Sequence, residues 1–140
     1  MNKSCVFCQI AQNKMQLNPV YTVYENNIVK CFLDMEPINE GHILIIPKEH
    51  YLDADELPDE IACEIMRMSQ RILKSLRQCY DFPGYSIMQN GDKFNDVGHY
   101  HMHISPRYDH DGFGWTYGET KMKSCNQKVA DKIKESLCAL

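Results

Sequence analysis

Apolar residues recur every three or four positions between residues 57 and 80, and this spacing predicts one long helix with a single buried face. Pro58 suits the first turn of such a helix. Residues 4–14 predict a short helix capped by Ser4. A final helix is predicted from Ser124, with Gln127 as its capping-box partner. The apolar positions of the two longer predicted helices are Leu57, Ile61, Ile65, Met68, Ile72 and Leu76, then Val129, Ile133 and Leu137.

Strands are predicted between the helices, where apolar residues alternate with polar ones or run together. Residues 20–34 predict two strands around a two-asparagine turn, and residues 42–48 predict a strand apolar enough to be covered on both faces. Two further strands are predicted over residues 85–90 and 99–107. Strands separated by single helices and short connections predict an α+β fold, in which a mainly antiparallel sheet of about five strands carries one long helix and short terminal helices.

The length and composition of the chain fit one hydrophobic core. Because the chain has 140 residues, 44% of them hydrophobic, we expect a single domain over residues 1–140, with 108–140 as a C-terminal extension and helix. The formal net charge is -4 and neither sign forms a long run, so we expect no nucleic-acid partner and no membrane-binding basic patch. No stretch approaches the roughly eighteen apolar residues of a membrane span, and we expect a soluble chain that is not exported.

Cysteine usage indicates a reducing compartment. The chain has seven cysteines, an odd number scattered through ordinary segments, which is a poor basis for a disulfide framework and fits the cytoplasm. Cys5 and Cys8 form a CxxC pair, and in a reducing compartment such a pair indicates a metal or redox site.

Three histidines stand at every second position of the last predicted strand: His99, His101 and His103. Alternate side chains of a strand point to the same face, so the three imidazoles share one face. The opposite face, which can belong to the core, carries Tyr100, Met102 and Ile104. Packing gives no reason to align three imidazoles that each need hydrogen bonds when buried. Three interpretations stay open: a zinc site, a nucleophilic imidazole with supporting neighbours, or exposed histidines without a shared role.

Three sequence blocks together resemble one family. "HYHMHISPR" follows "FLDMEP" and "GHILIIPKEH" in the order and approximate spacing found in the histidine-triad (HIT) superfamily of nucleotide hydrolases and transferases. The similarity covers residues from about 4 to 107, and the N-terminal CxxC and "DGFGW" segment are similar to bacterial members. The resemblance implies a HIT-like fold.

The resemblance also implies roles for the catalytic groups. His101 matches the histidine that attacks the α-phosphate and forms a nucleotidyl-histidine intermediate. His103 matches the histidine that contacts the phosphate or assists the leaving group, and His42 matches a remote histidine brought near the triad. Asp34 matches an acid that accepts hydrogen bonds from both ribose hydroxyls, although its position also suits an ordinary turn acid at a strand end.

Further residues match the family's nucleotide-binding positions. Asn90 matches an asparagine near the phosphate or ribose, although "QNG" could be only a turn. Asn95 stands where relatives often carry glutamine, which reaches one methylene further toward a phosphate. Apolar residues that match the family's base sandwich, and that could equally be simple core, are Val6, Phe7, Ile10, Phe32 and Met35.

A structural zinc site is a second implication of the resemblance. Members with an N-terminal CxxC complete four ligands with two histidines, which here are His50 and His99 beside Cys5 and Cys8. The alternative is a pair of reduced cysteines on a short helix. We expect zinc, and no organic cofactor.

The expected activity is hydrolysis at the α-phosphate of a dinucleoside polyphosphate or of a nucleoside phosphoramidate or adenylate. Two alternatives stay open: a non-enzymatic sensor of AMP-like nucleotides, and a zinc hydrolase that uses the three histidines as ligands. The resemblance further implies a homodimer that pairs through the long helix and a central strand. Trp115 either stacks on a second base or covers the core.

Overall fold

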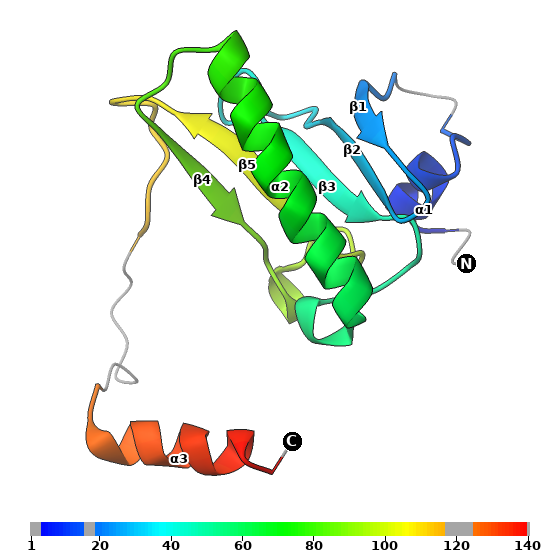
Figure 1. Cartoon of the computed structure of the whole chain (residues 1–140). Helices are drawn as coiled ribbons and strands as arrows, with labels where there is room; N and C mark the ends of the chain where they lie inside the picture. The colour runs from blue at the N-terminus through cyan, green and yellow to red at the C-terminus, as the bar shows by residue number, and fades with distance from the viewer. Residues whose placement is uncertain (1–3, 16–18, 117–124, 140) are drawn as a thin grey trace.

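The computed structural model describes residues 4–15, 19–116 and 125–139. Five strands form one antiparallel sheet in the order β1-β2-β3-β5-β4. The predicted α+β class, with its five strands and one long helix, is confirmed (Figure 1). The strands are β1 (Thr22–Glu25), β2 (Val29–Leu33), β3 (Ile43–Pro47), β4 (Gly84–Met88) and β5 (Met102–Arg107). The α-helices are α1 (Val6–Ala11), α2 (Asp59–Cys79) and α3 (Gln127–Leu137), with short 3₁₀ turns at Ala54–Glu56 and Asp92–Phe94.

Helices cover both faces of the sheet, and β3 lies between them. α2 lies across one face and α1 packs against the other (Figure 1). In β3, Ile43 and Ile45 belong to the core cluster beneath α2, while Leu44 and Ile46 belong to the cluster beneath α1. The prediction that this strand is covered on both faces is therefore confirmed.

The alternation of residues 99–104 is also confirmed. Tyr100, Met102 and Ile104 all belong to the core beneath α2. His103 lies opposite Leu44 of β3 in the register, so the histidine face is the α1 face. The strand itself starts at Met102 rather than at residue 99, because the backbone before it leaves the sheet and the Tyr100 N–H donates to the Tyr51 carbonyl over 2.7 Å.

Two predicted helix starts are wrong in detail. The N-cap of α1 is Cys5 rather than Ser4, and its side chain makes no capping hydrogen bond. α3 begins at Gln127, and Asn126 caps it by accepting from the Val129 N–H. The expected cap, Ser124, lies outside the described residues. The long helix begins one residue after Pro58, which occupies its N-cap.

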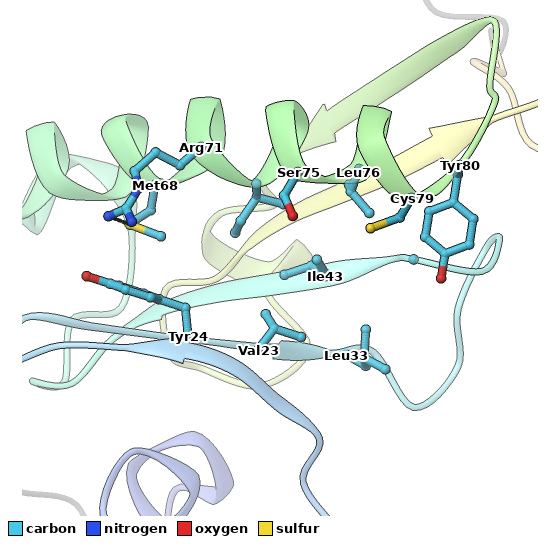
Figure 2. Close-up of a pocket in the computed structure, with 12 residues that line it drawn as sticks. Val23, Tyr24, Leu33, Ile43, Met68, Arg71, Ser75, Leu76, Cys79 and Tyr80 are labelled. Carbon is cyan, nitrogen blue, oxygen red and sulfur yellow. Dashed lines mark hydrogen bonds between the residues drawn. The ribbon is translucent and has the colours of Figure 1, made fainter.

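The C-terminal helix stands apart from the sheet (Figure 1). Its apolar residues lie on one face as predicted, yet no described residue of α3 is buried, and Val129, Ile133 and Leu137 are exposed. An apolar groove of about 440 Å³ lies elsewhere, between α2 and the sheet. Figure 2 shows Val23 and Ile43 of the sheet facing Leu76 and Cys79 of α2 across this groove.

The sheet has two edges that could pair with another chain. The central strand β3 is paired on both sides, whereas β1 and β4 are the outer strands.

Among the described residues, no helix is long and apolar enough to cross a membrane.

Ile45→Ala should lower the free energy of unfolding by about 2–5 kcal/mol, because Ile45 is fully buried and the variant leaves a cavity between the two helix layers. Ile133→Ala in the exposed face of α3 is the matched control and should change it by less than about 0.5 kcal/mol. Urea titration of both variants measures the difference. Equal effects would contradict the assignment of the core.

Candidate active site and metal cluster

One cavity of about 850 Å³ gathers four of the predicted catalytic and nucleotide-binding residues, Asp34, His42, Asn90 and His103. It lies beside β4 and β5, where the loop that follows β2 meets the start of β3. The lining residues are Asp34, Glu36, Ile38, His42, Tyr85, Ser86, Ile87, Met88, Gln89, Asn90, Asp96, His103, Phe113, Gly114 and Trp115.

His101 is buried beside this cavity with its tautomer fixed. Its Nδ1 lies 2.8 Å from the carbonyl oxygen of His99. A carbonyl only accepts hydrogen bonds, so Nδ1 carries the proton of the neutral ring and Nε2 keeps its lone pair. Burial lowers the pKa of His101, and the edge-on ring of Phe7, at 5.2 Å between centroids, contributes to that burial. An unprotonated Nε2 is the chemical requirement for a nucleophilic imidazole.

A second hydrogen-bonded pair joins His42 to His103. The Ile38 N–H donates to Nδ1 of His42 over 3.1 Å, so the proton of neutral His42 must be on Nε2. That atom lies 3.0 Å from Nδ1 of His103 and donates to it, which leaves the proton of neutral His103 on its Nε2. Burial lowers the pKa of His42, which favours this neutral state. Oδ2 of Asp34 lies 3.5 Å from His42 and 3.6 Å from His103.

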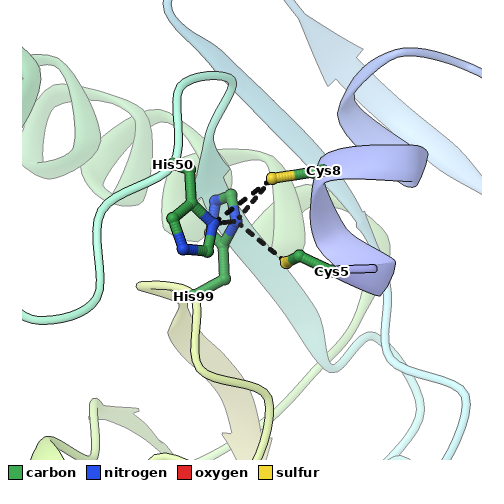
Figure 3. A group of neighbouring side chains, drawn as sticks. All are labelled: Cys5, Cys8, His50 and His99. Carbon is green, nitrogen blue, oxygen red and sulfur yellow. Dashed lines mark hydrogen bonds between the residues drawn. The ribbon is translucent and has the colours of Figure 1, made fainter. Parts of the chain in front are cut away.

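The cysteine pair and two histidines form a separate cluster (Figure 3). Sγ of Cys5 and Cys8 lie 3.5 and 3.6 Å from Nδ1 of His99. Nδ1 of His50 lies 3.3 Å from Sγ of Cys8 and 3.3 Å from Nδ1 of His99. Zinc bonds of about 2.0–2.1 Å to nitrogen and 2.3 Å to sulfur place tetrahedral ligands about 3.3–3.8 Å apart. The four donor atoms therefore fit a tetrahedral metal ion.

The tautomer of His99 fits the same interpretation. Its Nε2 lies 3.0 Å from the Pro47 carbonyl, so that nitrogen carries the proton and Nδ1 presents a lone pair to the cysteines. Burial lowers the pKa of His99 to about 4, so the ring stays neutral as a metal ligand must. The predicted ligand set Cys5, Cys8, His50 and His99 is brought together in the structure.

Asp34, His42 and His103 are also close enough to hold a metal ion, but their protons oppose it. The lone pair of His42 at Nδ1 accepts from the Ile38 N–H, and Nε2 is protonated. For His42 to bind a metal ion through Nε2, the proton would have to move from Nε2 to Nδ1. A protonated Nδ1 cannot accept from the Ile38 N–H, so that hydrogen bond would be lost. Nor do the three histidines of residues 99–103 form one ligand set, because His99 lies with the cysteines and His101 belongs to neither group.

The predicted nucleotide-binding residues fall into two groups. Asp34 and Asn90 line the cavity. Asn95 instead holds its own loop: its amide nitrogen donates to the Leu52 carbonyl over 2.8 Å, and its oxygen accepts from the Gly98 N–H over 3.0 Å. The apolar residues proposed for a base sandwich also divide, because Met35 is 62% exposed while Phe7, Ile10 and Phe32 are buried in the cluster beneath α1.

One residue of the cavity was not expected from the sequence, and a second decides between two alternatives. Asp96 lines it and places Oδ1 3.6 Å from Nε2 of His101, although its carboxylate is 84% exposed. Trp115 also lines it and is 86% exposed, so of the two roles that the sequence left open for Trp115, covering the core is wrong. The sequence did not predict Asp96 as a site residue, because Asp96 lies in an irregular loop whose path the residue pattern does not define.

The segment that carries Trp115 is held by one ion pair. Asp111 accepts from Nε of Arg107 over 2.6 Å and from the amide of Asn39 over 2.8 Å. Arg107 also donates to the Phe113 carbonyl. The hydrogen bonds that Asp111 accepts from Arg107 and Asn39 hold the pKa of its carboxyl well below its usual range. The chain after β5 is thereby fixed along the rim of the cavity.

The structure thus combines an open five-stranded antiparallel sheet with paired imidazoles at one cavity. Residues 16–110 match the family model for the HIT domain, and the chain belongs to this family. The CxxC pair at Cys5 and Cys8 fits the N-terminal motif expected of its bacterial members.

Two curated relatives illustrate the range of the family. An uncharacterized HIT-like protein of Methanocaldococcus jannaschii is 38% identical, over 84% of this chain and 89% of the relative. An adenosine 5'-monophosphoramidase of Schizosaccharomyces pombe is 30% identical, over 94% of this chain and 99% of the relative.

Solved structures share the fold. A HIT family protein of Bacillus subtilis superposes with a TM-score of 0.82 at 31% identity, over 98% of this chain and 96% of that one. A zinc-bound histidine triad family protein of Mycobacterium smegmatis has a TM-score of 0.71 at 28% identity, over 97% of this chain and 94% of that one.

The imidazoles of His42 and His101 should titrate below the ordinary value of about 6.5, because burial penalises their charged forms. NMR titration of the ring carbons, assigned with His42→Gln and His101→Gln, measures both midpoints. The unfolded chain binds these protons near pH 6.5 and the folded chain only at lower pH, so acidification below 6.5 should reduce the free energy of unfolding. A midpoint above 6.5 for His101 would contradict the neutral ring.

Proposed function

We propose that this chain is a nucleotide hydrolase that cleaves at the α-phosphate of its substrate through a nucleotidyl intermediate on His101. The observation that carries the proposal is the unprotonated Nε2 of a buried imidazole, fixed by the His99 carbonyl and next to a cavity of nucleotide size. Relatives named as adenosine 5'-monophosphoramidases support it. The leaving group is the second half of a dinucleoside polyphosphate, or the amine or acyl group of a phosphoramidate or adenylate.

In the first step, Nε2 of His101 forms a bond to phosphorus while the bond to the leaving group breaks. The Nε2–H of His103, whose Nδ1 accepts from His42, donates a hydrogen bond to the departing atom. The departing atom takes its proton from solvent, because a neutral imidazole that lost its only proton would become an imidazolate. His101 becomes an imidazolium whose Nδ1–H still donates to the His99 carbonyl. Water then attacks phosphorus, the P–N bond to His101 breaks, the proton lost by the water passes to solvent, and a nucleoside monophosphate leaves.

The nucleotide is held by groups at the same cavity. We propose that Asp34 accepts hydrogen bonds from the ribose hydroxyls and that Asn90 contacts the ribose or the phosphate, since both line the cavity. Met35 is exposed and free to contact the base, while Phe7, Ile10 and Phe32 are buried in the cluster beneath α1. Asn95 contributes through the shape of its loop, because its amide is already bonded.

His101→Ala should reduce kcat/KM by at least about a thousandfold, because it removes the nucleophile. Intact-protein mass after rapid acid-free quenching, with adenosine 5'-phosphoramidate and diadenosine tetraphosphate as substrates, should show one transient AMP adduct in the wild type and none in the variant. His110→Asn is the control: His110 is exposed, does not line the cavity, and has a φ of 63° that asparagine tolerates. Clear AMP binding without adduct or product would contradict the hydrolase and favour a nucleotide sensor.

We further propose that the ion held by Cys5, Cys8, His50 and His99 is zinc and that its role is structural. All four positions would be filled by protein, which leaves no open coordination site for a substrate. The ion would join α1 to the residues that precede β5. A zinc-bound relative of known structure supports the choice of metal.

Cys5→Ser should reduce the zinc content from about one ion per chain to near zero and lower the melting temperature by about 10 °C or more, because ligand binding stabilises the fold. Plasma mass spectrometry and calorimetry measure the two quantities. Cys63→Ser, at an exposed cysteine of α2, is the matched control. An unchanged melting temperature after loss of zinc would contradict a structural role.

Two broader proposals concern assembly and location. We propose that two copies pair through α2 and an edge strand, rather than the expected central strand, because β3 is already paired on both sides. Of the two edge strands, β1 and β4, we propose β4, where Tyr85 and Ile87 are exposed. We propose the cytoplasm as the compartment, which is supported by cysteines that form no disulfides, including the buried Cys31.

A further inference from the structure

In the proposed reaction, the phosphate group of the product carries more negative charge than the α-phosphate of the substrate. The substrate joins its α-phosphate to the nucleoside on one side and to the leaving group on the other, which leaves a single negative charge on the free oxygens. A nucleoside monophosphate has one more free oxygen, and its phosphate carries about 1.5 to 2 negative charges at pH 7. A charged side chain beside phosphorus therefore acts differently on substrate and product.

Asp96 places such a charge next to the position of the phosphorus atom. Its Oδ1 lies 3.6 Å from Nε2 of His101, the atom that attacks phosphorus in the proposed reaction. Because phosphorus approaches to one bond length from this nitrogen, the carboxylate lies on the side from which His101 attacks and away from the leaving group. The carboxylate of Asp34 has a different position, since its Oδ2 lies 3.5 Å from His42 and 3.6 Å from His103.

Hydrogen bonds hold the backbone of the loop on both sides of Asp96. Before it, the side-chain amide of Asn95 donates to Oδ1 of Asp53 over 3.3 Å, in addition to its bond with a backbone carbonyl. After it, the Gly98 N–H donates to the oxygen of the same Asn95 side chain over 3.0 Å. The Asp96 backbone is thereby fixed near His101, while its side chain is 84% exposed and can turn aside when a phosphate enters.

The cavity offers no cation to offset this carboxylate. No lysine or arginine is among the lining residues that the structure describes. The two imidazoles that line it form a neutral pair, in which Nε2 of His42 donates to Nδ1 of His103. A neutral N–H group binds a phosphate oxygen without cancelling its charge. The additional negative charge of the product therefore meets the charge of Asp96 without compensation.

We infer that Asp96 is a product-release residue, whose carboxylate weakens the binding of the dianionic nucleoside monophosphate more than that of the substrate with its singly charged α-phosphate. This inference rests on the proposed function.

The repulsion depends on the stage of the reaction. In the nucleotidyl intermediate, the single negative charge of the phosphate lies beside the positive ring of His101, so the pair is neutral. When water breaks the P–N bond and its proton passes to solvent, the ring becomes neutral and the phosphate gains a charge. The repulsion by Asp96 is therefore strongest once the product has formed. Asp96 takes no part in bond formation or proton transfer.

The test compares two ligands that differ by one charge at phosphorus: AMP and its methyl ester, in which a methyl group blocks one phosphate oxygen. Calorimetry at about pH 8, where AMP is a dianion, measures both dissociation constants. The ratio of the constant for AMP to that for the ester should fall by about two- to fivefold in Asp96→Asn, the range for one exposed charge pair. The methyl group itself cancels, because both proteins bind the same two ligands. Asp109→Asn removes an exposed carboxylate that does not line the cavity and should keep the wild-type ratio.

Turnover and salt provide further measurements. With adenosine 5'-phosphoramidate as substrate, the inhibition constant of AMP should also be lower in Asp96→Asn, because the product then leaves less readily. Salt screens an exposed carboxylate, so the difference between the wild type and Asp96→Asn should shrink between low salt and about 0.5 M sodium chloride.

Three results would count against the inference. Equal ratios in the wild type and Asp96→Asn, with normal AMP adducts, would overturn it and leave the proposed function intact. An unchanged ratio with slower adduct formation in Asp96→Asn would also overturn it, since the carboxylate would then act in the chemistry. No turnover and no adduct in the wild type would refute the proposed function, and the inference with it, because no product would form.

Discussion

The backbone of His99 is the constraint on which both sites depend. Its carbonyl fixes the tautomer of His101, while its ring presents Nδ1 to the two cysteines and donates from Nε2 to the Pro47 carbonyl. One residue thus joins the metal cluster to the nucleophile. A shift of the His99 backbone would displace both the ring and the carbonyl, and His101 would then lose the hydrogen bond that fixes its tautomer. The site therefore depends on the position of a peptide group as much as on side-chain chemistry.

Sheet register separates the tasks of the other two histidines. His103 lies opposite Leu44 of β3 and Met88 of β4, which holds its ring rigidly at the cavity. His101 precedes the strand, next to Tyr100, whose backbone N–H donates to Tyr51. The ring of His101 lies close to Phe7 and Asp96. The imidazoles of His101 and His103 thereby have different hydrogen-bond partners. Nε2 of His101 keeps a lone pair, whereas Nε2 of His103 keeps a proton.

Much of this arrangement could be predicted because it depends on periodicity and on local chemistry. The alternation of Tyr100, Met102 and Ile104 identified the core face, and the resemblance gave the four metal ligands that the structure brings together. The features that the sequence did not predict depend on the paths of loops and on contacts between distant segments. Trp115 and Asp96 lie in irregular segments whose position is decided by the Arg107 ion pair and by the bonds of Asn95. A stripe of apolar residues in α3 specified a helix, but it could not specify what covers that helix.

The separation of the metal ligands along the chain has a consequence for the order of folding. Cys5 and Cys8 are neighbours, but 94 positions separate Cys5 from His99. The chain between them contains four of the five strands and the long helix, so the cluster is completed only when nearly the whole sheet has formed. Closing a loop of this length has a large entropic cost, which the sheet must meet first. An ion captured early by the two cysteines would remain half-coordinated, and full coordination would mark the end of folding.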